Sequence, residues 1–192
     1  MNPARSNILG RVRAALRTEA HRPPVPSASP LWPPIGDLET RFREEFAALR
    51  GELLSDTQAL RHFLTGFPAI ATDGNELARS VVGDGNSIVR SADLGVTGCD
   101  CLVAQTGSIF VTTRSAGGRA LSVLPAAHLV VARRDQLVPD LEAAFALMRK
   151  RYDRHWPSLL CLISGPSRTA DIEKILVMGA HGPKRLAVYW AG

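Results

Sequence analysis

An apolar run gives way to a hydroxyl-rich loop in Leu159-Leu160-Cys161-Leu162-Ile163-Ser164-Gly165-Pro166-Ser167-Arg168-Thr169-Ala170-Asp171-Ile172-Glu173. The pattern predicts a strand, a loop and a helix, with the turn at Gly165 and Pro166. Ser164, Ser167 and Thr169 are each suited to cap the predicted helix, because a side-chain oxygen can accept from the unpaired amides at a helix N-terminus. Strands followed by helices are typical of an α/β sheet.

The predicted helix start is also a candidate anion site. Its first amides lack partners within the helix, and the helix dipole adds positive charge at that end. Arg168 could hold a phosphate or a carboxylate through two hydrogen bonds. A capped helix whose Asp171 and Glu173 complement the dipole explains the same residues, so both interpretations stay open.

The chain has 192 residues, of which 45% are apolar. This length fits one well-buried domain with an appendage. No apolar run approaches the roughly 20 residues that span a bilayer, and the N-terminus lacks the apolar core of a secretory signal. We therefore expect a cytoplasmic protein without an integral membrane segment.

Three cysteines are present, Cys99, Cys101 and Cys161. The odd number and the absence of a CxxC pair argue against a disulfide framework, an iron–sulfur site or a structural zinc site. Cys99 and Cys101 would lie on one face of a strand, where cysteine usually packs as a small apolar side chain. The sequence predicts no metal site and no cofactor bound by this chain.

The formal charge of +5 is unevenly distributed. Residues 1–22 hold five arginines and one glutamate, so the rest of the chain is nearly neutral. In that remainder, aromatic residues do not alternate with basic ones as they do in nucleic-acid-binding surfaces. Nucleic acid is therefore not an expected partner.

Three segments follow one another along the chain. Residues 1–22 predict a basic amphipathic helix, because apolar residues recur along one helical stripe: Ile8, Leu9, Val12, Ala15 and Leu16. Such a helix can dock on its own domain, on an acidic partner or on a membrane surface. Residues 23–36 are rich in proline and predict an extended linker, and residues 37–192 form the main domain.

Within the main domain, helical spacing begins after Asp37, in 75–82 and again after Pro139, where acidic residues precede basic ones as the helix dipole favours. Strands are predicted at 108–113, 121–124, 128–132 and 186–190. The first two would be joined through residues 115–118, giving a β meander.

The strong nucleotide and hydrolase signatures, GxGxxG, GxxxxGK[ST], GxSxG and HExxH, are missing from the sequence. Small polar loops remain at 105–108, 125–128, 164–173 and 181–183, with Arg119 and Ser122 nearby in sequence. In open α/β sheets, ligands bind where the loops at the carboxyl ends of the strands converge. We expect these loops to meet at such an edge.

Five motifs resemble one family in their order and spacing: Gly95-Val96-Thr97, Ala104-Gln105-Thr106-Gly107-Ser108, Leu124-Pro125-Ala126-Ala127-His128, Ser164 to Glu173, and Gly179-Ala180-His181-Gly182-Pro183. The family is that of the lactate-utilisation (LUD domain) proteins of the LutC/YkgG type, and the resemblance covers residues 37–192. It implies a Rossmann-like three-layer α/β/α fold related to the NagB/RpiA/CoA-transferase-like group, with an N-terminal helical arm.

The resemblance also implies a role beside two partner proteins that carry iron–sulfur clusters and oxidise L-lactate to pyruvate. In this interpretation the chain is a subunit without a cluster, which fits its three cysteines. The alternative is a free-standing enzyme or binding protein for a small phosphorylated or CoA-linked carboxylic acid. Both interpretations predict a small anionic ligand.

One position departs from the family pattern, because Gln105 stands where members usually carry glutamate. An amide cannot act as a general base, which favours binding over catalysis at this loop. His128 and His181 are each either site residues or structural, and Arg119 either reaches an anion or lies exposed. The predicted ligand-binding residues are Gln105, Thr106, Gly107, Ser108, Arg119, His128, Ser164, Gly165, Ser167, Arg168, Thr169 and His181.

Overall fold

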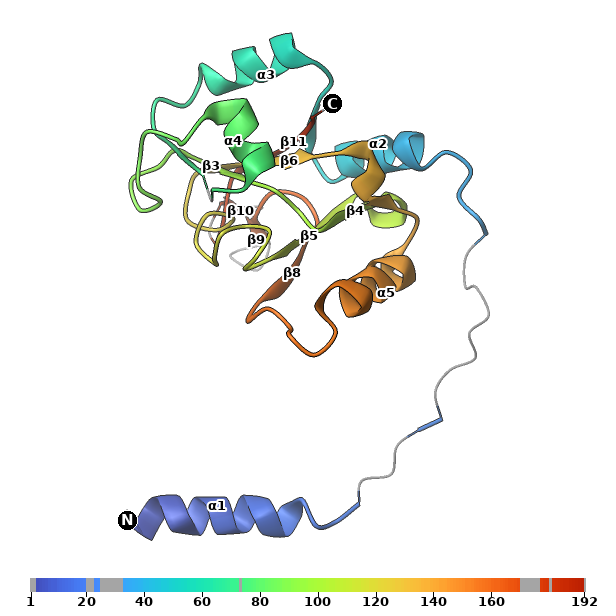
Figure 1. Ribbon diagram of the computed structural model, residues 1–192, viewed down its shortest axis with the longest axis vertical. Coiled ribbons are helices and arrows are strands. Elements are labelled where there is room, and N and C mark those ends of the chain that lie inside the picture. Colours follow the sequence, from blue (N-terminus) through green and yellow to red (C-terminus); the bar gives the residue numbers. More distant parts are fainter. Residues whose placement is uncertain are drawn as a thin grey trace. The chain divides into compact units, whose positions relative to one another are not determined.

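The computed structural model describes residues 3–19, 23–24, 33–72, 74–169, 177–179 and 181–191. The chain divides into two units, Met1–Pro34 and Ile35–Gly192, which are described separately (Figure 1). The first unit contains helix α1 (Pro3–Ala15), which has no buried residue. Its apolar side chains Ile8 and Val12 are exposed, as is Leu16 just beyond it.

The second unit is built on a five-stranded parallel sheet. In spatial order the strands are β1 (Glu52–Leu54), β11 (Arg185–Trp190), β6 (Ala127–Ala132), β3 (Leu94–Thr97) and β2 (Ile70–Thr72). Every residue of β3 and β6 is buried, which explains their continuous apolar sequences. The structure confirms the predicted mixed α/β class and the predicted strands at 128–132 and 186–190.

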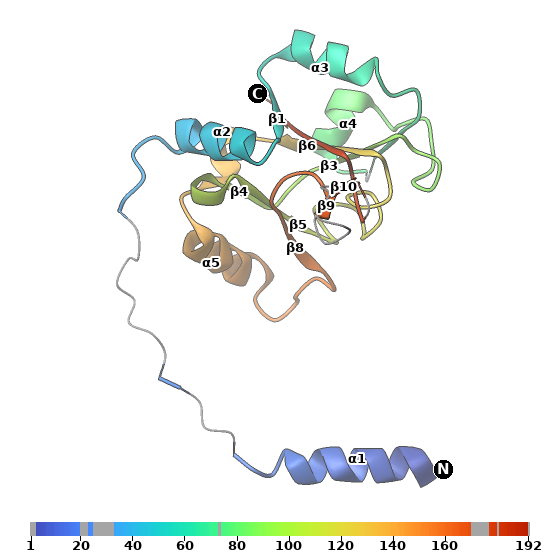
Figure 2. The same cartoon turned by 180° about the vertical axis from the view of Figure 1, so that it is seen from behind.

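Helices cover both faces of this sheet (Figures 1 and 2). One face packs against α3 (Thr57–Leu64) and α4 (Glu76–Val82) through a core that includes Phe63, Ala78 and Leu129. The other face packs against α2 (Leu38–Ala48), whose Phe42 and Phe46 are fully buried. Asp37 caps α2 by accepting from the Glu39 amide, at the helix start that the sequence predicted.

A second, four-stranded sheet lies on the α2 side and was not predicted. Its spatial order is β7 (Leu137–Val138), β4 (Cys101–Val103), β5 (Ser108–Thr112) and β8 (Leu160–Ile163). Leu102 and Ile109 point into the core shared with Phe42 and Val130. The opposite face packs Val103 and Phe110 against α5 (Leu141–Tyr152), which begins at the predicted place with Asp140 as its cap.

The predicted β meander is wrong. Strand β5 is present, but residues 121–124 form a turn in which the amides of Val123 and Leu124 both donate to the Ala120 carbonyl. Strands β5 and β6 then belong to different sheets. The turn lies against β3, where Gly95 allows close approach, because a Cβ there would collide with the Leu121 carbonyl oxygen.

None of the described helices combines the length and the apolar character needed to cross a membrane.

Candidate functional site

Two serines from distant parts of the chain meet where β5 begins and β8 ends. Antiparallel pairing sets Ile109 opposite Ile163, so Ser108 and Ser164 are neighbours across the two strands. Their hydroxyl oxygens lie 2.7 Å apart. Ser108 Oγ also donates to the Thr106 carbonyl at 3.3 Å, which leaves Ser164 as the donor between the two hydroxyls.

The turns that carry these serines are pressed against the end of α2. Gly107 ends the short 3-10 helix η1 (Ala104–Thr106) at φ +60°, and a Cβ there would lie 2.5 Å from the Phe46 amide nitrogen. Gly165 has φ +90°, and its Cβ would lie 2.6 Å from the Leu49 carbonyl oxygen. Both positions need glycine for conformation and for space, so α2 fixes the serine pair.

The loop that follows Ser164 packs on the loop that precedes β11. The Ser167 amide donates to the Pro183 carbonyl at 2.8 Å, and Ser167 Oγ accepts from the His181 amide at 3.3 Å. The Lys184 amide in turn donates to the Ala126 carbonyl, just before β6. Three of the four predicted polar loops, those around Ser164, Ala126 and His181, are therefore linked by backbone contacts.

The predicted edge of the sheet is nevertheless wrong for two of these loops. Residues 125–128 and 181–183 lead into the amino ends of β6 and β11, and so lie at the opposite edge from the carboxyl ends. The reason is that the chain reaches β6 from β5 of the second sheet, and β11 from residues 177–178, which pair with residues 168–169 in a separate two-stranded sheet. Neither of these sheets was predicted.

Ser164 and Ser167 do not cap a helix, so that part of the predicted helix start is wrong. Arg168 and Thr169 form β9, which pairs antiparallel with β10 (Val177–Met178). No helix begins between Ser164 and Arg168, so an anion site on helix amides is not present at those residues, and a helix start after Thr169 would fall outside the described residues. Ala170, Asp171, Ile172 and Glu173, the rest of the predicted helix start, lie outside the described residues.

The two predicted arginines do not join the serine pair through any described contact. Arg119 Nη2 donates to the Ser158 carbonyl at 2.7 Å and so braces the segment between α5 and β8. Arg168 is exposed on β9. Gln105 is half-buried. Its backbone N–H donates to the Pro139 carbonyl at 2.9 Å, which ties η1 to the start of α5.

His128 is completely buried in the centre of the parallel sheet. Its Nε2 lies 2.8 Å from Thr97 Oγ1, which itself donates to the Gly98 carbonyl. The Thr97 hydroxyl has only one proton, so Nε2 must carry the proton that His128 donates. Nδ1 then has a lone pair without a partner among the described residues, as does the buried hydroxyl of Thr106.

Burial lowers the pKa of His128 from 6.5 to about 4. Below pH 6.5 the unfolded chain binds a proton at this residue that the folded protein does not, so the stability falls as the pH falls towards 4. We expect His128→Leu to flatten this dependence by up to about 1.4 kcal/mol per pH unit. Urea unfolding of the wild type and of His128→Leu between pH 7 and pH 4.5 measures this dependence. If the free energy of unfolding changes with pH equally in both proteins, His128 does not titrate as described.

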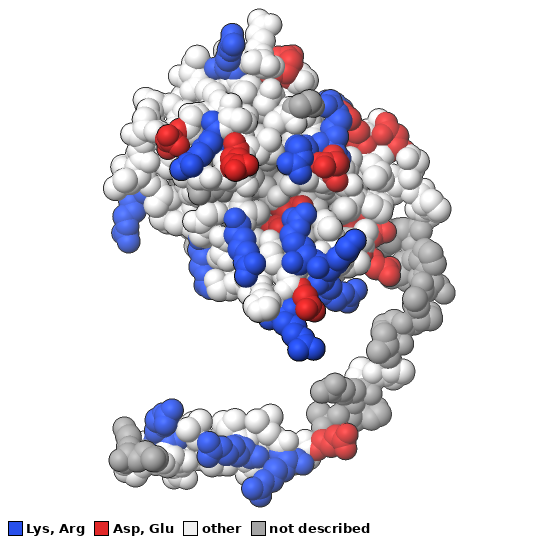
Figure 3. Space-filling model, in the orientation of Figure 1, with Lys and Arg blue, Asp and Glu red and all other residues white. Residues whose placement is uncertain are grey.

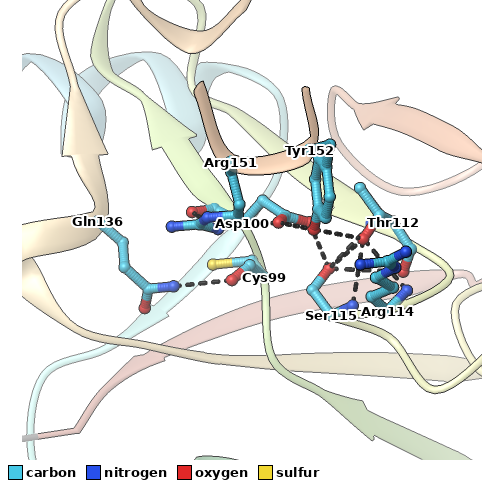
Figure 4. Close-up of polar contacts among 8 residues, drawn as sticks. All are labelled: Cys99, Asp100, Thr112, Arg114, Ser115, Gln136, Arg151 and Tyr152. Carbon is cyan, nitrogen blue, oxygen red and sulfur yellow. Dashed lines mark hydrogen bonds and ion pairs between the residues drawn. The ribbon is translucent and has the colours of Figure 1, made fainter. Parts of the chain in front are cut away.

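Sequence analysis missed a buried carboxylate between Cys99 and Cys101 (Figure 4). Asp100 is 1% exposed and accepts from Ser115 Oγ at 2.6 Å, Tyr152 Oη at 2.5 Å and Arg151 Nη1 at 2.8 Å. These contacts tie α5 to the start of β4. The only sequence signal was an acidic residue between two cysteines, just before the apolar residues of β4.

The environment of Asp100 perturbs its neighbours. Burial and the hydrogen bond to Asp100 raise the pKa of Tyr152, so the phenol stays protonated. Burial raises the pKa of Cys99, and that of Cys101 to about 12. Both thiols are buried and protonated at neutral pH, which confirms that they pack as apolar side chains. They do not share one face of a strand as expected, because Cys99 precedes β4 and packs near Phe42, whereas Cys101 packs near Phe110.

These features define a mixed α/β protein in which two serine hydroxyls, fixed by glycine turns, lie beside linked polar loops. The LUD domain family matches residues 37–189, and the chain therefore belongs to that family. It is similar to lactate utilization protein C of Deinococcus radiodurans, with 40% identity over 106 residues, and to lactate utilization protein C 1 of Bacillus mycoides, with 35% over 100 residues.

These matches cover 53% and 51% of this chain and 47% and 43% of the relatives, so the aligned region is less than half of either relative. A crystal structure of a DUF162 family protein from Deinococcus radiodurans has the same fold, with a TM-score of 0.64 and 23% identity. That comparison covers 81% of this chain and 96% of the other.

Proposed function

We propose that this chain is the subunit without an iron–sulfur cluster in a system that oxidises L-lactate to pyruvate, and that its serine pair binds a small hydroxy acid. Support for the pathway comes from the relatives, which are named lactate utilization proteins. Support for the binding role comes from the Ser108–Ser164 pair, in which the exposed Ser164 hydroxyl is held on a fixed frame and can exchange its bond to Ser108 for one to a ligand.

The chemistry of the site favours binding over proton transfer. Ser108 is buried and Ser164 is exposed, so a ligand would reach Ser164. The Ser164 hydroxyl would turn from Ser108 towards the ligand, where it would donate to a carboxylate or accept from a hydroxyl group, the two polar groups of lactate. Gln105 carries an amide in place of the family's usual carboxylate and cannot take up a proton. The iron–sulfur clusters and the electron acceptor would then belong to partner proteins.

Removing the serine pair should abolish ligand binding. A ligand at about 100 times its dissociation constant stabilises a protein by about 2.7 kcal/mol, so L-lactate should raise the melting temperature of the wild type. We expect no shift for Ser108→Ala/Ser164→Ala, whereas Ser80→Ala/Ser91→Ala, which changes exposed serines, should respond like the wild type. A full shift in the first variant would place the ligand elsewhere.

The same thermal-shift measurement distinguishes L-lactate from the alternative ligands. Stabilisation by a phosphorylated or CoA-linked acid, with none by L-lactate, would favour a free-standing enzyme or binding protein. That alternative was predicted from the anion loop at Ser164–Thr169 and from an analogy of fold, and the last two residues of this loop form β9.

The N-terminal arm has a proposed role in assembly. Helix α1 exposes Ile8 at 62% and Val12 at 48%, beside several arginines, and an apolar stripe of this kind is suited to a groove on a partner. Deleting residues 1–22 should weaken binding to the iron–sulfur partners at least tenfold and leave the melting temperature of the main domain unchanged. Isothermal titration with the purified partners tests this, and equal affinity would reject the arm as a docking element.

A further inference from the structure

A dense group of basic side chains surrounds the C-terminal end of α5. Figure 3 shows Lys and Arg gathered over the part of the second unit where Figure 1 draws β8 and α5. The group combines exposed residues of three segments: Arg114, Arg119, Arg149, Lys150 and Arg154. We call these residues, together with Trp156, the α5 basic face.

Six arginines elsewhere in the second unit form ion pairs with surface carboxylates, whereas Arg50, Arg61 and Arg90 form none among the described contacts. The ion pairs are Arg41–Glu45, Arg43–Glu39, Arg79–Asp84, Arg133–Asp135, Arg134–Glu39 and Arg185–Glu52. On the α5 basic face, by contrast, the guanidinium groups of Arg114 and Arg119 donate to the carbonyls of His155 and Ser158. A carbonyl fixes the position of a guanidinium group but leaves its full charge.

The acidic groups near this face do not balance it. Asp100 is buried and already paired with Arg151, and Asp153 is a single exposed carboxylate at the end of α5. The α5 dipole accounts for basic residues in its last turn, including Arg149 and Lys150. It does not account for Arg114, Arg119 and Arg154, which lie outside the helix.

The face also has an aromatic component. Trp156 is 47% exposed, and its ring centroid lies 6.4 Å from that of Tyr152. The Arg114 guanidinium carbon lies 5.5 Å from the Tyr152 ring centroid, so Arg114 and Trp156 are both held by the same tyrosine. Exposed tryptophan and arginine side chains held in place are the residue types that contribute most to protein–protein binding energy.

We propose that the α5 basic face binds an acidic segment of a partner protein. Carboxylates of the segment would pair with the unneutralised guanidinium groups, and an apolar residue of the segment would cover Trp156. Fixed positive charge accelerates such an encounter, and the buried aromatic contact holds the complex. This surface lies apart from the contacts of the serine pair, so the proposal does not depend on the proposed function.

A charge-matched experiment tests the surface. The probe is a fluorescein-labelled peptide of twelve glutamates with one central phenylalanine, and binding to the full chain is followed by fluorescence anisotropy at low salt. Arg149→Glu/Arg154→Glu should weaken binding at least tenfold. Arg61→Glu/Arg90→Glu changes the net charge equally at exposed positions off this face, and should weaken it less than threefold. Equal losses would show that only net charge matters and would overturn the proposal.

Tryptophan fluorescence and oligonucleotide binding complete the test. Unlabelled peptide should change the tryptophan emission of the wild type but not that of Trp156→Phe, and identical responses would overturn the role of Trp156.

A single-stranded oligonucleotide of twelve nucleotides should bind more weakly than the peptide. Tighter binding of the oligonucleotide, lost in Arg149→Glu/Arg154→Glu, would instead assign the face to nucleic acid. Circular dichroism confirms that each variant is folded.

Discussion

Asp100→Ala is expected to lower the free energy of unfolding by about 3 kcal/mol, because removing one member of a buried charged network leaves its partners without compensation. Tyr152 Oη and Ser115 Oγ would both lose their Asp100 contacts, and Arg151 would lose its only described carboxylate. Urea unfolding at pH 7 measures the loss. A cost below 1 kcal/mol would show that the network does not hold α5 on β4.

Asp135→Ala is the matched control for this result. Asp135 pairs with Arg133 at 3.1 Å, but the two side chains are 70% and 55% exposed. Exposed ion pairs contribute about 0–1 kcal/mol. The comparison therefore separates the effect of burial from that of ion pairing itself.

Gly107→Ala is expected to destabilise the protein by about 3 kcal/mol and to disturb the serine pair. A left-handed backbone costs a non-glycine residue about 1–2 kcal/mol, and forcing an atom into a packed interior adds about 1–3 kcal/mol. The added Cβ would meet the backbone of Phe46, which cannot move aside as a flexible side chain could. The variant should also lose the thermal response to L-lactate.

Gly83→Ala measures a conformational cost without a cost of space. Gly83 has φ +70° and ψ −154°, a backbone region adopted almost only by glycine, and nothing lies within 4 Å of its Cβ position. We expect a loss of about 1–3 kcal/mol from conformation alone. For Gly107→Ala itself, a loss no larger than about 1 kcal/mol would show that the contact between Gly107 and α2 contributes no stability.

The sequence predicted those elements whose local signals agree with their packing. Asp37 and Asp140 cap α2 and α5, and the apolar runs of β6 and β11 are buried as continuous strands. The turn at 121–124 was mistaken for a strand because a short apolar run carries no information about its partner. The conformation of this turn depends on Gly95, which lies in β3.

The candidate site was only partly predictable for a related reason. The polar loops were identified from their composition, and the structure does bring Ser108 next to Ser164 and Ser167 next to His181. The loops at 125–128 and 181–183 lie at the amino ends of β6 and β11, because the chain reaches these strands from two other sheets formed by pairing that local periodicity does not reveal. The relation to the NagB/RpiA/CoA-transferase-like group stays a prediction.

Growth on L-lactate tests the central claim most directly. The gene for this chain would be deleted in its host, and the growth rate measured with L-lactate and then with pyruvate as the sole carbon source. We predict loss of growth on L-lactate, normal growth on pyruvate, and recovery with the wild-type gene but not with Ser108→Ala/Ser164→Ala. Normal growth of the deletion strain on L-lactate would contradict the proposed role.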